Sequence, residues 1–103
     1  MILPAYVAAE VDHLIGTRLG REAERAFLRD LASGVYRVEA MTTDEHALAL
    51  ELDEDLPGLG LADLSIVVLA ARHRTKRVLT FDVRDFRPAR PLDGGWFEIL
   101  PEM

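Results

Sequence analysis

The stretch GLGLADLSIVVLAARHRTKRVLTFDVRDF, residues 58–86, decides the fold of this 103-residue chain. Its first half is almost continuously apolar, which predicts a helix over Leu61–Arg72 that is buried on most sides. Its second half predicts a short buried strand over Lys76–Phe81 and then a turn over Asp82–Arg87. A buried helix that leads directly into a buried strand is typical of an α/β domain with a mostly parallel sheet.

The flanking segments continue this alternation of helices and strands. The elements expected there are helices over Ala5–Ile15 and Arg21–Ala32, separated by a break at Gly16–Gly20, a strand over Tyr36–Met41, a helix from Thr42 to about Asp53, and a strand over Trp96–Leu100. Thr42 and Glu45 form the pattern of a capping box at the start of the third helix. We expect one domain over residues 1–103, because the length and composition suit a single core.

Composition excludes several classes of protein. The chain has no cysteine, which excludes a disulfide framework and a thiolate metal site. Its longest uncharged run, Met1–Ala9, is far shorter than the roughly 20 residues of a membrane-spanning helix. We therefore expect a soluble cytoplasmic protein that does not bind membranes.

The charges are unevenly distributed. The net charge is −6, which counts against simple electrostatic binding of nucleic acid. Residues 39–63 carry eight acidic side chains and no Lys or Arg, whereas residues 72–90 carry seven basic side chains and two acidic ones. Each charge taken singly suits a solvated helix face. Together they suit an acidic cleft with basic rims, as a metal-dependent enzyme acting on a polyanion would have.

Three carboxylates occupy positions where chemistry is expected. Glu10 lies in an apolar helix, Asp63 in the first turn of the buried helix, and Asp82 directly after a strand. Sites in α/β sheets form beyond the carboxyl ends of strands, and converging carboxylates bind hard ions such as Mg²⁺ or Mn²⁺. Each acid also has a simpler explanation, which spacing leaves open: helix-terminus electrostatics for Asp63, a turn for Asp82, and an exposed helix side for Glu10.

The motifs of this chain resemble those of the PIN-domain family, and in particular its VapC-type toxins. The segments that carry the resemblance are PAYVAAEVDHLIGTRLG (4–20), YRVEAMT (36–42), the stretch 58–86, and GGWFEILP (94–101). The helix GLADLSIVVLA followed by RVLTFDVRDF is its most specific part. The resemblance implies a three-layer α/β/α fold and a Mg²⁺- or Mn²⁺-dependent endoribonuclease. It also implies a homodimer that is silenced by a small VapB-like antitoxin.

The resemblance assigns roles to individual residues. Glu10, Asp63 and Asp82 match the family's catalytic metal ligands, and Thr80 is a neighbouring polar contact. Asp85 is either a peripheral ligand or a turn residue, and the turn is favoured. The candidate RNA contacts are Arg72, Arg74, Lys76, Arg77 and Arg84, because an acidic cleft needs nearby positive charge to bind a polyanion.

The chain departs from the family pattern at its start. Family members begin with a central strand that ends in a VDTSAL-type segment, whose aspartate is the first metal ligand. Residues 1–3 instead resemble the end of the family's second strand. About 30 residues, one strand and two helices at average lengths, are therefore expected to be missing from this sequence. We expect an incomplete reading of a longer protein, rather than a remnant, because all three carboxylates remain.

Two other functions stay open from the residues. One is a catalytically dead PIN-like module that dimerises or binds an antitoxin. The other is a different doubly wound protein, such as a receiver-like or phosphatase domain, against which the acidic start of the helix at Asp63 argues.

Overall fold

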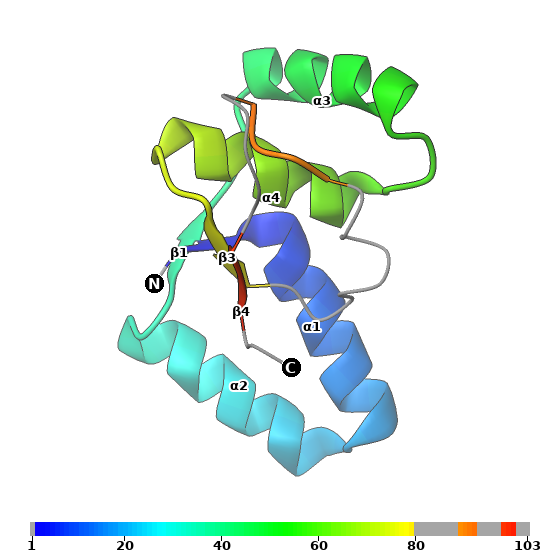
Figure 1. Cartoon of the computed structure of the whole chain (residues 1–103). Coiled ribbons are helices and arrows are strands. Elements are labelled where there is room, and N and C mark those ends of the chain that lie inside the picture. The colour runs from blue at the N-terminus through cyan, green and yellow to red at the C-terminus, as the bar shows by residue number, and fades with distance from the viewer. Residues whose placement is uncertain (1, 80–88, 93–97, 101–103) are drawn as a thin grey trace. The chain divides into compact units, whose positions relative to one another are not determined.

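A computed structural model of the chain describes residues 2–79, 89–92 and 98–100 (Figure 1). Contacts between Cα atoms divide the chain into two compact units, Met1–Ala40 and Met41–Met103. Each unit contains helices and a pair of parallel strands.

The first unit is a β-α-α-β arrangement. Strand β1 spans Ile2–Pro4, helix α1 spans Ala5–Arg18, helix α2 spans Arg21–Ser33, and strand β2 spans Arg37–Glu39. The two strands are parallel, with Leu3 opposite Val38. Helix α1 packs against α2 and against both strands, and its Val7 and Val11 are buried.

The end of α1 differs from the sequence prediction. A break was expected at Gly16–Gly20, but the helix continues through Gly16 and ends at Arg18. The hydroxyl of Thr17 donates to the carbonyl of His13 at 2.9 Å, which keeps the last turn hydrogen-bonded. The N–H groups of Leu19 and Gly20 both donate to the carbonyl of Ile15. A single glycine costs a helix only about 1 kcal/mol, so Gly16 does not stop it.

The second unit contains two helices and the other strand pair. Helix α3 spans Thr43–Asp55, helix α4 spans Leu61–Arg72, strand β3 spans Arg77–Leu79, and strand β4 spans Glu98–Leu100. Strands β3 and β4 are parallel, with Val78 opposite Ile99. Helix α4 packs against α3 and β3. The capping box predicted at the start of α3 is confirmed, since Thr42 and Glu45 exchange hydrogen bonds of 2.9 and 3.1 Å.

Helix α4 is the most deeply buried element described. All seven residues from Leu64 to Ala70 are buried, as the uninterrupted apolar sequence predicted. Ser65 is the one polar residue among them, and its hydroxyl donates to the carbonyl of Ala62 one turn earlier. This bond satisfies the hydroxyl inside the helix, so the rest of the surface of α4 can pack against apolar neighbours.

The α/β class and the parallel strand pairing are confirmed. Strand β2 is shorter than predicted and covers three residues of the expected Tyr36–Met41. Strand β3 covers Arg77–Leu79 of the expected Lys76–Phe81, and the last two residues of that range lie outside the described part. No helix in the described ranges is both long enough and apolar enough to cross a membrane.

Burial of α4 gives a direct test of this packing. Leu69 is 2% exposed, whereas Leu50 on α3 is 67% exposed. We expect Leu69→Ala to lower the free energy of unfolding by about 2–5 kcal/mol, because it leaves a cavity in the core. Urea denaturation followed by circular dichroism measures the change. Leu50→Ala is the matched control, with an expected change within about 0.5 kcal/mol. Equal losses from both variants would contradict the described packing.

Candidate functional site

Asp63 is held at the start of the buried helix by the loop before it. Gly60 precedes α4 with φ of 89°, a conformation that favours glycine, and its carbonyl accepts the N–H of Leu64 at 2.9 Å. Leu59 is buried and anchors the loop. Gly60 is the N-cap residue and has no side chain to cap the helix, and the half-buried Asp63 lies in the first turn, near the positive end of the helix dipole.

Glu10 lies in the middle of α1 and is exposed, between the buried Val7 and Val11. Asp12, two residues later, is half-buried, and its Oδ1 atom is buried without a hydrogen-bond partner in the described part of the chain. Successive residues are about 100° apart around a helix, so Glu10 and Asp12 lie on nearly opposite sides of α1. Asp12 is therefore not part of a site built around Glu10.

The structure does not bring the predicted metal ligands together, because they lie in different units or outside the described residues. Thr80, Asp82, Arg84 and Asp85 lie outside the described residues. Glu10 belongs to the first unit and Asp63 to the second. Within residues 2–79, 89–92 and 98–100, no group of three or more His, Asp or Glu side chains could hold a metal ion. The three-carboxylate site includes Asp82, so it stays a prediction. Its donor set consists of carboxylate oxygens, which fit Mg²⁺ or Mn²⁺.

Arg72, a predicted RNA contact, makes an ion pair with Glu45 inside the second unit. Its Nε donates to Glu45 Oε2 at 3.0 Å, and a terminal guanidinium nitrogen donates to Glu45 Oε1. The same Oε1 atom accepts the backbone N–H of Thr42 at 2.9 Å. Glu45 thus caps the start of α3 and fastens the end of α4 to it. The capping box was visible in the sequence, but the partner 27 residues away was not.

This network changes the ionisation of Glu45. Hydrogen bonds from the Arg72 guanidinium lower the pKa of the Glu45 carboxyl from 4.5 to about 2, and the Thr42 N–H adds to this effect. Burial acts in the opposite direction but is outweighed. The carboxylate therefore stays ionised, and the ion pair stays formed, throughout the ordinary pH range.

The chain leaves α4 through a left-handed turn at Arg74. The N–H of Arg74 donates to the carbonyl of Ala71 at 3.1 Å, and the N–H of Thr75 donates to the carbonyl of Ala70 at 2.9 Å. This pair of bonds is a Schellman motif, in which the residue in the position of Arg74 is most often glycine. Arg74 has φ of 52° and is the one non-glycine residue with a positive φ among those described.

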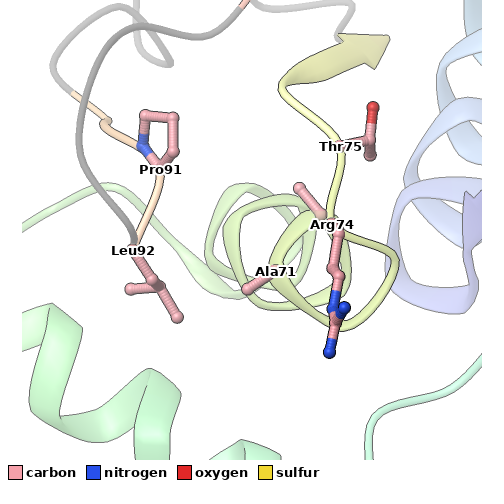
Figure 2. A pocket seen from close by; sticks show the side chains of 6 residues that line it. Ala71, Arg74, Thr75, Pro91 and Leu92 are labelled. Atoms are coloured by element: carbon pink, nitrogen blue, oxygen red, sulfur yellow. The ribbon is translucent and has the colours of Figure 1, made fainter.

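A pocket lies beside this turn, within the second unit. It is lined by Ala70, Ala71, Arg74, Thr75, Pro91 and Leu92 and has a volume of about 390 Å³. Figure 2 shows Pro91 and Leu92 on one side of the pocket and Ala71, Arg74 and Thr75 on the other. Most of the lining is apolar, with one cationic side chain and one hydroxyl. Sequence reasoning did not find it, because residues 89–92 have no pattern that places them beside α4.

These features define an α/β protein with an acidic residue at the start of its buried helix. The family model of the PIN domain matches residues 1–90, and the chain belongs to this family. Over 104 aligned residues the chain is 39% identical to ribonuclease VapC26 of Mycobacterium tuberculosis, an alignment that covers 98% of this chain and 76% of that protein. The resemblance to the VapC-type members of the family is confirmed.

The pair between Glu45 and Arg72 makes a pH-dependent contribution to stability. Because the pKa of Glu45 is lower in the folded chain than its usual 4.5, this contribution is complete above about pH 4.5 and is lost as the pH falls towards 2. We expect Arg72→Gln to lower the free energy of unfolding by about 1 kcal/mol at pH 7, with the difference from wild type shrinking below pH 4.5. Urea denaturation at a series of pH values measures it.

Arg37→Gln is the matched control for this experiment. Arg37 also faces a carboxylate, Glu39, but the nearest atoms are 3.6 Å apart and the arginine side chain is 76% exposed. Its removal is expected to change stability little at any pH. A constant difference between Arg72→Gln and wild type from pH 7 to pH 3 would show that the ionised Glu45 is not the cause.

Proposed function

We propose that this protein is a divalent-metal-dependent endoribonuclease and the toxin of a VapBC-like toxin–antitoxin pair. The observation that carries the proposal is the 39% identity to ribonuclease VapC26 across 98% of the chain. The PIN-domain match supports it independently of that relative, and it extends over Glu10, Asp63 and Asp82 alike. A VapB-like antitoxin, a homodimer and action on RNA in the cytoplasm belong to the same proposal.

The proposed metal ligands are Glu10, Asp63 and Asp82, with Thr80 as a polar neighbour and Asp85 at the periphery. A bound Mg²⁺ or Mn²⁺ ion would supply an activated water and charge stabilisation at a phosphodiester. Asp63 is suited to this role because it projects from the first turn of a helix whose following seven residues are buried. A rigidly held carboxylate loses little conformational freedom when it binds an ion.

Substrate binding is assigned to the basic segment after α4. Arg74, Lys76 and Arg77 are exposed and follow one another closely on the chain, which suits contacts to successive phosphates. Arg84 is proposed to join them. Arg72 belongs to the same proposed set, and its guanidinium also pairs with Glu45.

Substitution of the proposed ligands tests the enzymatic activity. We expect Asp63→Asn or Asp82→Asn to lower the rate of Mn²⁺-dependent cleavage of a structured RNA at least about a hundredfold, and Glu10→Gln to act in the same direction. EDTA should abolish wild-type cleavage. Gel electrophoresis of end-labelled RNA measures the products. Asp53→Asn removes an exposed acid of α3 and should leave the rate unchanged.

The outcomes separate the candidate functions. Undiminished cleavage by Asp63→Asn would sink the ligand assignment. If wild type binds no Mn²⁺ and cuts no RNA but forms a stable complex with the product of a neighbouring gene, a catalytically inactive binding module becomes the better description.

A further inference from the structure

A pocket lies at the end of α4, within the second unit. Its volume of about 390 Å³ lies within the roughly 300–1,000 Å³ of small-molecule sites. Ala70, Ala71, Pro91 and Leu92 provide apolar walls, while Arg74 and Thr75 provide a cation and a hydroxyl at the edge. Such a combination suits a flat, mostly apolar group that is attached to an anion.

Arg74 occupies its position at a cost to the backbone. A left-handed conformation is unfavourable for a residue with a Cβ atom, by about 1–2 kcal/mol, and glycine adopts it freely. The two hydrogen bonds of the Schellman motif need only the backbone of residue 74 and would form equally well with glycine. The arginine side chain is therefore not required to end the helix, which points to a use for its charge.

The surrounding charge favours an anionic ligand with several negative groups. Arg74, Lys76 and Arg77 follow Arg72, whose charge is paired with Glu45. The Glu45 carboxylate is engaged at Arg72, away from the turn at Arg74. The carbonyl groups of Ala70 and Ala71 are also capped by the N–H groups of Thr75 and Arg74, so they present no unsatisfied acceptors to an incoming anion.

We propose that this pocket anchors single-stranded RNA by accepting one unpaired base against its apolar walls while Arg74 binds the adjoining phosphate. The inference rests on the proposed ribonuclease function and names a second contact for the same substrate. An unpaired base can stack on a guanidinium plane and bury its faces against apolar side chains, and both contacts tolerate different bases. The proposal therefore predicts affinity for single strands with little dependence on sequence.

The anchor is separate from the proposed cleavage site. Asp63 is at the first turn of α4 and Arg74 follows its last turn, eleven residues on, which corresponds to roughly 16 Å along a helix. One nucleotide cannot occupy both places. The anchored base therefore belongs to a nucleotide several positions away from the cleaved bond, and the pocket contributes to binding rather than to the chemical step.

Binding of an unstructured RNA of about 16 nucleotides to the whole chain in EDTA tests the anchor without cleavage. Fluorescence anisotropy is measured at several salt concentrations. We expect Arg74→Gly to weaken binding about five- to tenfold and to lower the salt slope by about 0.7, the loss of one phosphate contact to a single strand. The same substitution should raise the Tm by about 2–5 °C, because it relieves the left-handed strain. A merely structural arginine would lower the Tm on removal.

Ala71→Leu tests the pocket itself, because it fills the space without changing the charge or adding an aromatic ring on which a base could stack. Ala71 lines the pocket and is exposed, so the fold is expected to accept the larger side chain, as the thermal unfolding curve will show. This variant should weaken RNA binding but leave the binding of inorganic polyphosphate, which has no bases, unchanged. Arg25→Gln, which removes an exposed charge of α2, is the matched control and should bind RNA like wild type.

Several results would overturn the anchor. Unchanged RNA affinity in Ala71→Leu, or equal losses in Arg25→Gln and Arg74→Gly, would leave only general electrostatic attraction. Tighter binding of a polyglutamate peptide than of RNA would assign the pocket to an acidic peptide. Cleavage by wild type with unaltered RNA affinity in both pocket variants would remove the anchor and leave the ribonuclease proposal intact. If both pocket variants lose RNA affinity as expected but wild type never cuts RNA in Mn²⁺, the ribonuclease proposal is overturned and the binding of RNA at the pocket stands.

Discussion

Burial of α4 is the constraint on which the second unit depends. Seven consecutive residues of this helix, Leu64–Ala70, are withdrawn from water, and the single hydroxyl among them, that of Ser65, is satisfied within the helix. A helix that is apolar on all sides has no stable exposed face, so its neighbours must cover it. Its two ends are consequently fixed in space, with Asp63 at the first and Arg74 just beyond the last.

The ion pair between Glu45 and Arg72 adds direction to this apolar packing. Apolar contacts alone would let α3 slide along α4, because they have no preferred partner atoms. Glu45 is already held by the capping box, and a guanidinium binds a carboxylate in a fixed geometry. The pair therefore sets which turn of α3 meets the end of α4, and the low pKa of Glu45 keeps it formed over the ordinary pH range.

The two ends of α4 carry different groups, which suit different roles in the proposed function. The start carries a carboxylate beside the positive end of the helix dipole, which suits a metal ligand. The end carries a basic segment and a pocket whose arginine is held in an unfavourable backbone conformation. Strained residues persist only where the surrounding structure determines them, and they are enriched at functional sites. In the proposed ribonuclease, the rigid helix would keep the chemical step and the anchored nucleotide at a constant separation.

Local patterns in the sequence determined most of the elements. The capping box at Thr42 and Glu45 and the burial of α4 each depend on residues within one or two turns, and both were predicted. The family resemblance likewise came from short motifs in their order along the chain, and the choice of Glu10, Asp63 and Asp82 as ligands rests on it. Only the tertiary structure joined Arg72 to Glu45 and set residues 89–92 beside Arg74. Those contacts depend on how helices and loops pack across many residues, and the separation along the chain does not encode that packing.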